Sequence, residues 1–362
     1  MKSSLDEARS IINEVDSEMA RLFVRRMEAA KTVAEYKKER GLRIYDAQRE
    51  EEVVRRNSAL VEDDEIRGYY VNFLKNNMAV SRSYQDMLMQ GMRVAYSGTE
   101  GAFAHIATEK LFPAARKIGY GDFRSAYEAV ERGEADVCVL PLENSYNGEV
   151  GQVTDLMFSG SLYINAMTDI AVTQDLVGLP SATVESVKEV VSHPQALAQC
   201  TGYIREHGFI EREFSNTALA AKHVSELGDP TVAAIASAEA ANVFGLKVLE
   251  HNINASRTNT TRFAVFSRTD NRYSPMAKGV QSIFVFTVRN EAGALAKAID
   301  IIGKHGFNMR NLKSRPMKEL LWQYFFYVEA EGNLNTDEGA LMLKELGQYC
   351  DMLKTVGTFT VN

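Results

Sequence analysis

Residues 5–40 read LDEARSIINEVDSEMARLFVRRMEAAKTVAEYKKER, and their apolar side chains recur every three or four positions. This period predicts one long helix with an apolar stripe along one side. Arg26 and Lys37 continue the stripe, since at about 100° per residue both lie within roughly 20° of its centre. A cation on a buried face needs a partner. Because the two residues are about 16 Å apart along the helix, the pattern favours a small ligand with two separated negative charges, such as a dicarboxylate.

Composition limits the class of protein. The 362 residues are 45% hydrophobic and 25% charged, which is typical of a folded, water-soluble protein with two or three domains. A formal net charge of -7 offers no basic surface for nucleic acid. The three cysteines are far apart and lack metal-ligand spacing, so we expect no metal site. Because neither a signal peptide nor an apolar stretch of membrane length is recognisable, the sequence predicts a cytoplasmic protein without a membrane partner.

The helical period continues to about residue 90 and is broken at Gly41 and near Asp63, which predicts three helices. The first helix is long and has no second layer within its own segment. We therefore expect these 90 residues to complete their core by pairing with a second copy of the chain, so that the protein is at least a dimer.

Beyond Gly91 the pattern changes to strands alternating with helices, which is typical of an α/β domain. A polar stretch from Thr269 to Gly279 predicts a linker. The residues that follow it predict the element order βαββαβ. The sequence thus predicts an all-α domain, an α/β domain and an α+β domain in that order.

Further polar residues lie on the faces of the predicted helices where apolar ones belong. They are Asp46, which is also an expected N-cap, with Arg49 and Glu50 on the second helix, and Ser81 and Gln85 on the third. Arg9 lies about 100° around the first helix from Arg26, so it points to a partner's site rather than its own. The alternative is that these side chains bury only their stems, or form an ion-pair network that fixes the dimer register.

This set of residues resembles the polar set of the all-helical chorismate mutases, and the resemblance covers residues 1–90. The matching residues are Arg9, Arg26, Lys37, Asp46, Arg49, Glu50, Ser81 and Gln85. The resemblance implies rearrangement of chorismate to prephenate without a covalent intermediate, so that positioning and electrostatics carry the rate.

The same resemblance implies a role for each group. Arg26 and Arg9 of the partner subunit would hold the two carboxylates of chorismate through charge-assisted hydrogen bonds. Lys37 and Gln85 would face the ether oxygen, where negative charge develops, and Glu50 would hold the ring hydroxyl. Asp46, Arg49 and Ser81 would complete the site.

In the α/β segment, polar residues follow the ends of predicted strands, where open sheets place their sites. They are Glu143 and Asn144 after the strand from Val137, and Ser192 and Gln199 after the strand from Val190. Thr261, Arg262 and Phe263 instead open a strand, so this strand should run antiparallel to the others if its polar end is to join the same edge. Taken singly, each residue also suits an ordinary turn, cap or strand.

Together these residues resemble the prephenate dehydratase pattern over residues 93–268, which ends in the Thr, Arg, Phe triplet. The resemblance implies two α/β lobes around a cleft, similar to periplasmic binding proteins, and conversion of prephenate to phenylpyruvate. Thr261 would be essential, Arg262 would anchor a carboxylate, and Phe263, Asn144, Ser192 and Gln199 would bind substrate. The proton donor stays open, because Glu143 can act as an acid only if burial raises its pKa, whereas Thr261 can orient the leaving hydroxyl without titrating.

Residues 280–362 resemble an ACT regulatory domain with a ferredoxin-like fold. The resemblance rests on Gly293, Ala294 and Leu295 at the first helix and on Ser314, Arg315 and Pro316 in the second strand. It implies L-phenylalanine as an allosteric effector. Lys313 stands where an acidic residue is usual. The alternative is a dimerisation domain that binds nothing.

The three segments together predict a bifunctional chorismate mutase and prephenate dehydratase of phenylalanine biosynthesis, with feedback inhibition and without a metal or organic cofactor. The alternative from a different class is an amino-acid-responsive binding protein in which both enzyme segments are inactive. Turnover of chorismate separates the two hypotheses.

Overall fold

The computed structural model describes residues 4–255, 258–271, 277–317 and 323–360. The chain divides into two compact units, Met1–Met92 and Arg93–Asn362. Within the described residues, no helix has the length and apolar character needed to span a membrane.

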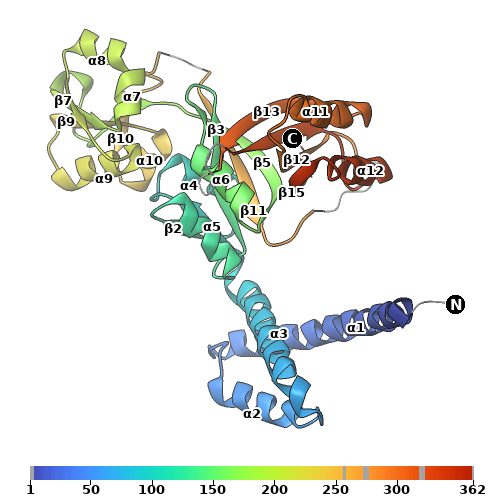
Figure 1. The fold of residues 1–362 in the computed structure, drawn as a ribbon. Helices are drawn as coiled ribbons and strands as arrows, with labels where there is room; N and C mark the ends of the chain where they lie inside the picture. Colours follow the sequence, from blue (N-terminus) through green and yellow to red (C-terminus); the bar gives the residue numbers. More distant parts are fainter. Residues whose placement is uncertain (1–3, 256–257, 272–276, 318–322, 361–362) are drawn as a thin grey trace. The chain divides into compact units, whose positions relative to one another are not determined.

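The first unit consists of α1 (Ser4–Glu39), α2 (Ala47–Ser58) and α3 (Asp64–Gln90), so the prediction of three helices is confirmed (Figure 1). The breaks have local causes. Gly41 adopts a φ of 62°, which is unfavourable for other residues, and Asp63 caps α3 by accepting from the Glu65 backbone N–H. Helices α1 and α3 pack through the buried residues Ala30, Ala34 and Met78.

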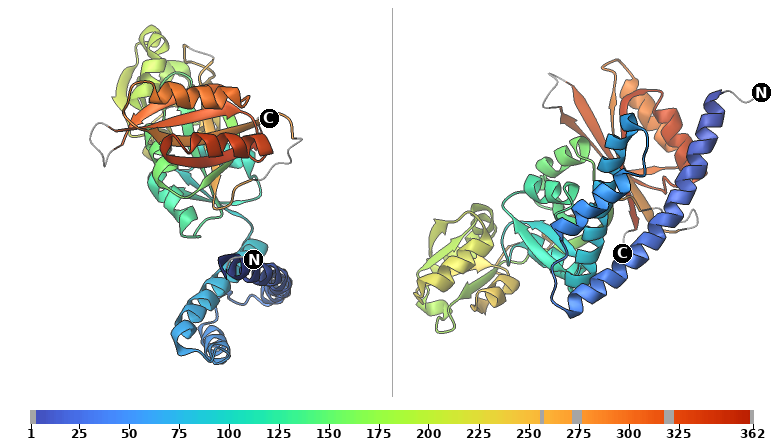
Figure 2. Two further views of the ribbon diagram at one scale, coloured as in Figure 1. Left: turned by 45° about the vertical axis from the view of Figure 1, so that its right-hand side comes forward. Right: turned by 90° about the horizontal axis from the view of Figure 1, so that it is seen from below.

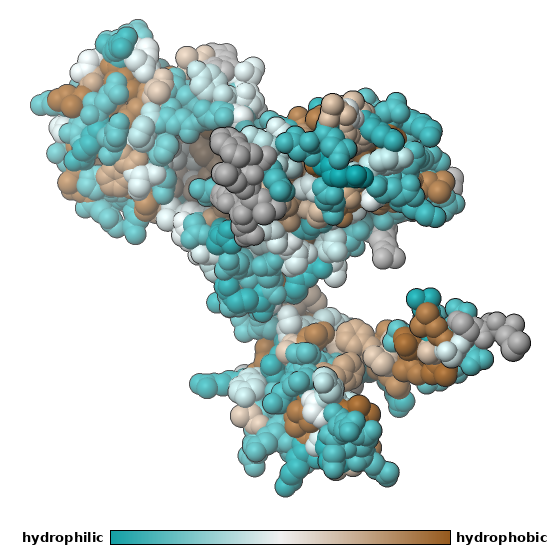
Figure 3. Space-filling model, viewed as in Figure 1, coloured by the Kyte–Doolittle hydropathy of each residue, from teal (hydrophilic) through white to brown (hydrophobic). Residues whose placement is uncertain are grey.

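Among the described residues, none buries the N-terminal half of α1 in this way. Its apolar stripe of Ile12, Val15, Met19 and Leu22 is between 42% and 62% exposed. Figure 3 shows hydrophobic surface along this helix. An exposed apolar stripe of this length is typical of an interaction surface.

The second unit begins with a sheet in the order β2-β1-β3-β11-β5, with β4 paired to β3. The strands are β1 (Arg93–Ser97), β2 (Arg116–Tyr120), β3 (Val137–Asn144), β4 (Gly148–Glu149), β5 (Tyr163–Ala171) and β11 (Thr260–Ser267). The predicted antiparallel direction of β11 is confirmed on both sides, against β3 and β5. The helices of this lobe are α4 (Phe103–Leu111), α5 (Phe123–Glu131) and α6 (Gly151–Ser159).

A second sheet forms the other lobe, in the order β10-β6-β9-β7-β8. Its elements are β6 (Asp175–Gly178), a 3₁₀ turn (Val184–Ser186), β7 (Glu189–Ser192), α7 (Pro194–Gln199), α8 (Thr201–His207), β8 (Ile210–Glu213), α9 (Thr217–Leu227), β9 (Val232–Ala236), α10 (Ala238–Val243) and β10 (Lys247–Glu250). The predicted two-lobed architecture is therefore present. The chain crosses between the lobes twice, after β5 and after β10, and the two crossings are hydrogen-bonded to each other through Gln174 and Ile253.

The C-terminal part has the predicted order βαββαβ: β12 (Val280–Val288), α11 (Ala294–Lys304), β13 (Asn308–Pro316), β14 (Tyr324–Glu331), α12 (Asp337–Leu346) and β15 (Cys350–Thr360). Its antiparallel sheet has the order β13-β14-β12-β15. Both helices lie on one face of this sheet (Figure 2), where they pack on Phe284, Phe286 and Val328.

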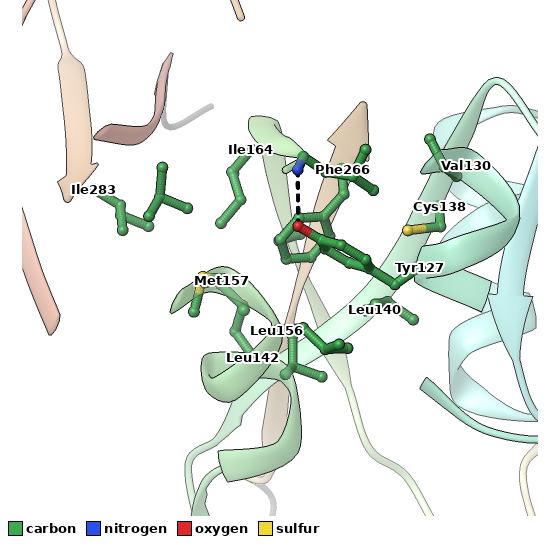
Figure 4. Close-up of a cluster of buried hydrophobic side chains, with 14 of the residues drawn as sticks. Tyr127, Val130, Cys138, Leu140, Leu142, Leu156, Met157, Ile164, Phe266 and Ile283 are labelled. Atoms are coloured by element: carbon green, nitrogen blue, oxygen red, sulfur yellow. Dashed lines mark hydrogen bonds between the residues drawn. The ribbon is translucent and has the colours of Figure 1, made fainter. Parts of the chain in front are cut away.

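The other face of the C-terminal sheet shares a core with the first lobe. Ile283, Val285, Phe325 and Tyr327 belong to the same buried cluster as the side chains of α5, α6, β3 and β11. Figure 4 shows Ile283 in this cluster with residues of the first lobe. The two sheets approach each other closely at Gly357, where a Cβ would overlap the backbone of Ile164.

This contact generates a prediction for Gly357→Ala. The added methyl group has no space against a backbone, so we expect a loss of about 1–3 kcal/mol of stability. At about 2–4 °C per kcal/mol for a unit of this size, the melting temperature of the second unit should fall by several degrees in calorimetry. Gly303→Ala is the matched control, because nothing lies within 4 Å of its Cβ and alanine favours the helix. An unchanged melting temperature for Gly357→Ala would contradict the close approach.

Candidate active sites

The two cations of the α1 stripe are half-buried and bind backbone carbonyls. Arg26 Nη1 donates to the Asn77 carbonyl at 3.2 Å, and Lys37 Nζ donates to the Ile44 carbonyl at 2.6 Å. Burial lowers the pKa of Arg26. In the part of the chain that the structure describes, neither cation forms an ion pair with a carboxylate. Both therefore keep charge and donors for a ligand, as expected for an anion site.

Two predicted polar residues of α3, Ser81 and Gln85, are buried, and Ser81 lies beside Arg26. The Ser81 hydroxyl donates to the same Asn77 carbonyl at 3.0 Å, so Arg26 and Ser81 meet at one oxygen. Gln85 is 8% exposed, and its Oε1 atom has no hydrogen-bond partner among the described residues. Leaving this acceptor unpaired costs about 1–3 kcal/mol, so the described residues do not fully satisfy the Gln85 amide.

The remaining predicted residues of this unit have local partners. Asp46 is the N-cap of α2, as predicted, and accepts from the Arg49 backbone N–H at 3.0 Å. The Arg49 guanidinium pairs with Glu52 at 2.6 Å, and Arg9 is exposed. Glu50 forms an ion pair with Arg82 of α3. Arg82 was missed, although it precedes Gln85 by one helical turn on the same helix.

A groove of about 690 Å³ opens between α1 and α3 in this unit. Its lining includes the exposed stripe residues Met19 and Leu22, together with Tyr70, Phe73 and Leu74 from α3. Arg26 lies in the same lining. The apolar groove and the cationic residue thus adjoin each other within one unit.

In the second unit, a cleft of about 360 Å³ lies between the two lobes. The polar residues of its lining include Asn144, Thr261 and Asn259 from the first lobe side and Gln174, Gln199, His193, Gln195, Asn216 and Thr217 from the crossings and the second lobe. Three residues chosen from sequence, Asn144, Gln199 and Thr261, are therefore brought together.

Asn144 is the centre of the hydrogen-bond network in this cleft. Its Nδ2 donates to Thr261 Oγ1 at 2.9 Å and to Asn259 Oδ1 at 2.7 Å, while its Oδ1 accepts from the backbone N–H groups of Tyr146 and Asn147 at 3.0 Å each. Both ends of the amide are thus fully used. The network fixes the start of β11 against the end of β3.

This network leaves the Thr261 hydroxyl proton free. Thr261 is 9% exposed and accepts from Asn144, and no acceptor for its own O–H is present among the described residues. Because the hydroxyl can still donate, it is suited to a hydrogen bond with a leaving oxygen in the cleft.

Two residues that were missed join the lobes at this site. Asn259 connects Asn144 to Gln199 of the second lobe, to which it donates at 3.3 Å. Gln174, at the first crossing, is 3% exposed and its Oε1 lacks a partner among the described residues. Each directly precedes a strand at a crossing between the lobes, Gln174 before β6 and Asn259 before β11.

Four predicted residues do not line the cleft. Arg262 and Glu143 face the C-terminal sheet, because each neighbours a cleft residue on its strand and side chains alternate between faces. Arg262 pairs with Asp169 at 3.2 Å and with the buried Glu329 at 3.4 Å, and Glu143 pairs with Lys313 at 2.8 Å. The remaining two are Ser192, fully buried with its hydroxyl on the Ile235 carbonyl at 2.5 Å, and Phe263, which is 2% exposed.

The residues predicted to bind an effector do not lie on one face of the C-terminal sheet. Gly293, with a φ of 84°, precedes α11, and Ala294 and Leu295 begin it. Ser314 and Pro316 lie on the exposed side of β13. Arg315 lies on the opposite side, where it pairs with Asp155 at 2.9 Å and Glu149 at 3.4 Å.

Comparison with known proteins connects both sites to enzyme families. The chorismate mutase type II family model matches residues 8–86, and the prephenate dehydratase model matches residues 94–271. The chain is 31% identical to a bifunctional chorismate mutase/prephenate dehydratase of Aquifex aeolicus, over 98% of this chain and 97% of that protein.

Two solved structures resemble the second unit. A prephenate dehydratase from Arthrobacter aurescens, in complex with L-Phe, has a TM-score of 0.69 and 27% identity, over 75% of this chain and 90% of that one. A chain described as a quorum-quenching acylase, GqqA, has the same TM-score and 30% identity, over 75% of this chain and 98% of that one. The fold of the second unit is therefore compatible with more than one described activity. The match over the full length, including the helical unit, decides the family: the chain belongs to the bifunctional chorismate mutase/prephenate dehydratases.

Proposed function

We propose that the helical unit rearranges chorismate to prephenate and that the cleft of the second unit converts prephenate to phenylpyruvate. The observation that carries the proposal is the meeting of Asn144, Thr261 and Gln199 in one cleft. Among the described residues, the same chain carries Arg26, which has no carboxylate partner, and the unpaired Oε1 atom of Gln85. The chain would thereby supply the carbon skeleton of phenylalanine, and the cytosol stays its predicted location.

In the mutase reaction, one C–O bond breaks as a C–C bond forms, and charge develops on the ether oxygen. Arg26 holds one carboxylate of chorismate, and the Lys37 Nζ and Gln85 Nε2 atoms donate to the ether oxygen. Glu50 holds the ring hydroxyl. Its ion pair with Arg82 keeps this carboxylate oriented.

The mutase site is completed by a second subunit. Support comes from the exposed stripe of α1 and the apolar groove beside it, which a second copy of α1 would cover. In this dimer, the exposed Arg9 of the partner subunit holds the second carboxylate. The protein is thus a homodimer or a higher oligomer.

In the dehydratase reaction, the ring carboxylate of prephenate leaves as carbon dioxide. Its bonding electrons complete the aromatic ring, and the ring hydroxyl leaves as water once it is protonated. The free O–H of Thr261 donates to this leaving oxygen, with its direction set by Asn144. The amides of Gln174 and Gln199 hold the polar side chain of the substrate from the first crossing and the second lobe.

The C-terminal sheet and its two helices are an ACT domain with a ferredoxin-like fold, and L-phenylalanine is its effector. Support comes from the strand order β13-β14-β12-β15 and from the L-Phe complex of the Arthrobacter enzyme. The effector site comprises Gly293, Ala294 and Leu295, with Ser314 and Pro316 on the facing strand. The remaining alternative is a domain that only dimerises, which titration of the full chain with L-phenylalanine excludes if heat is released at millimolar ligand.

Variants separate the two activities. Arg26→Ala should lower mutase kcat/KM by at least about 10³-fold, because a charged bidentate contact is lost, and should leave turnover of supplied prephenate unchanged. Arg25→Ala, on an exposed neighbour, is the control. Joint loss of both activities in a folded Arg26→Ala protein would contradict two separate sites.

Thr261→Val should lower the dehydratase activity and leave the mutase activity unchanged, because valine keeps the shape of threonine but removes the hydroxyl donor. We expect dehydratase kcat to fall by about 10²-fold or more, with mutase kcat unchanged. Thr260→Val, which removes a hydroxyl from the adjacent residue outside the cleft, is the control. Near-normal dehydratase turnover in Thr261→Val would remove this hydroxyl from the mechanism.

Mixing two inactive variants tests the shared site. If Arg9 acts in the partner's site, refolding Arg9→Ala together with Arg26→Ala should restore about a quarter of the wild-type mutase activity, because half of the dimers are mixed and each has one intact site. Mixing either variant with itself is the control. Absence of recovery in a proven mixed dimer would place Arg9 outside the partner's site.

A further inference from the structure

Two cationic side chains of strand β13 extend from the C-terminal sheet and bind the first lobe. Residues Lys313 and Arg315 alternate with the exposed Ser314 and lie opposite Tyr327 and Phe325 in the register with β14. Tyr327 and Phe325 belong to the core shared with the first lobe. Lys313 and Arg315 therefore lie at the edge of this buried core, where ion pairs are less screened than on an open surface.

Their partners are the two strands of one hairpin and the helix that follows it. Lys313 Nζ donates to Glu143 Oε1 of β3 at 2.8 Å. Arg315 Nη1 lies 3.4 Å from Glu149 Oε1 of β4, and its Nε donates to Asp155 Oδ1 of α6 at 2.9 Å. A Cβ at Gly151 would overlap this guanidinium, so the arginine also packs closely against the start of α6.

The hairpin that these cations hold carries the central amide of the cleft. Glu143 and Glu149 are opposite each other in the β3–β4 register, and the next pair is Asn144 with Gly148. Along each strand, side chains alternate between faces. The outer face of the hairpin thus binds Lys313 and Arg315, and the inner face presents Asn144 to Thr261. Glu149 lines both the outer cavity and the cleft.

The contact between Lys313 and Glu143 requires a positive charge at position 313. An acidic residue there would lie next to Glu143, with the buried Glu329 lining the same small cavity. Like charges at this distance repel, and the repulsion would push the hairpin away from the C-terminal sheet. A lysine at the same position attracts Glu143.

We propose that Lys313 and Arg315 are positioning residues of the dehydratase site, holding from outside the hairpin that carries Asn144. The inference rests on the proposed dehydratase function. It gives the C-terminal domain a part in the reaction that does not depend on an effector. Displacement of a reacting group by about 1 Å can cost on the order of 10²-fold in rate, so a loosened hairpin should lower kcat.

The test measures dehydratase kcat and KM in full-length Lys313→Gln and Arg315→Gln, at a temperature well below each variant's unfolding midpoint. We expect kcat to fall by about ten-fold in each, with a smaller change in the KM for prephenate and with mutase kcat unchanged. Lys313→Arg should keep most of the activity, because it can still pair with Glu143. Arg310→Gln is the matched control, since Arg310 lies on the same strand but pairs with Glu331 within its own sheet.

A charge exchange distinguishes positioning from a direct role of Glu143. Lys313→Glu alone should be the least active variant, and adding Glu143→Lys should recover part of the lost kcat. No recovery by the exchange, kcat within two-fold of wild type in both Gln variants, or an equal loss in Arg310→Gln would overturn the proposal. Failure of the proposed function is recognised separately, because the wild-type chain would then not turn over prephenate at all.

Discussion

A polar group that is removed from water needs a hydrogen-bond partner. The two candidate sites differ in whether the protein itself supplies that partner. In the cleft of the second unit, the Asn144 amide is satisfied on both ends, and the Thr261 hydroxyl that it contacts has no acceptor among the described residues. In the helical unit, the Gln85 carbonyl is buried without a partner in the described part of the chain, and Arg26 binds only a main-chain oxygen there. The first arrangement is preorganised by the fold, whereas the second is left incomplete by the described residues.

The C-terminal domain packs closely against the first lobe of the second unit. Its sheet continues the core of the first lobe, approaches Ile164 backbone to backbone at Gly357, and binds α6 by three means. Lys354 binds the carbonyls of Met157 and Gly160 at the end of this helix, Arg315 binds Asp155, and Phe325 stacks on Phe158 with ring centroids 4.3 Å apart. Strand β13 thus presents Lys313 and Arg315 to the lobe and Ser314 to the side that carries the helices and the proposed effector site.

Much of the fold was predictable from the sequence, because it follows from local chemistry. The breaks between helices follow from Gly41 and Asp63, and the direction of β11 follows from its polar start. The faces of Glu143 and Arg262 were misassigned, although strand alternation forbids neighbouring residues from sharing a face with Asn144 and Thr261. The roles of Arg82, Asn259 and Gln174 could not be predicted, because each depends on a partner or cleft formed by distant segments. The same holds for the C-terminal cations, whose partners lie about 160–170 residues earlier in the chain.

The central claim is that a single chain carries two working sites, one for each step from chorismate to phenylpyruvate. The most direct measurement is a nuclear magnetic resonance time course of the wild-type protein with chorismate at neutral pH, where prephenate does not aromatise through acid. The account predicts that chorismate signals decay, that prephenate signals rise and then fall, and that phenylpyruvate accumulates with release of carbon dioxide. Chorismate that persists unchanged with well-folded protein would contradict the account and favour a binding protein with inactive enzyme segments.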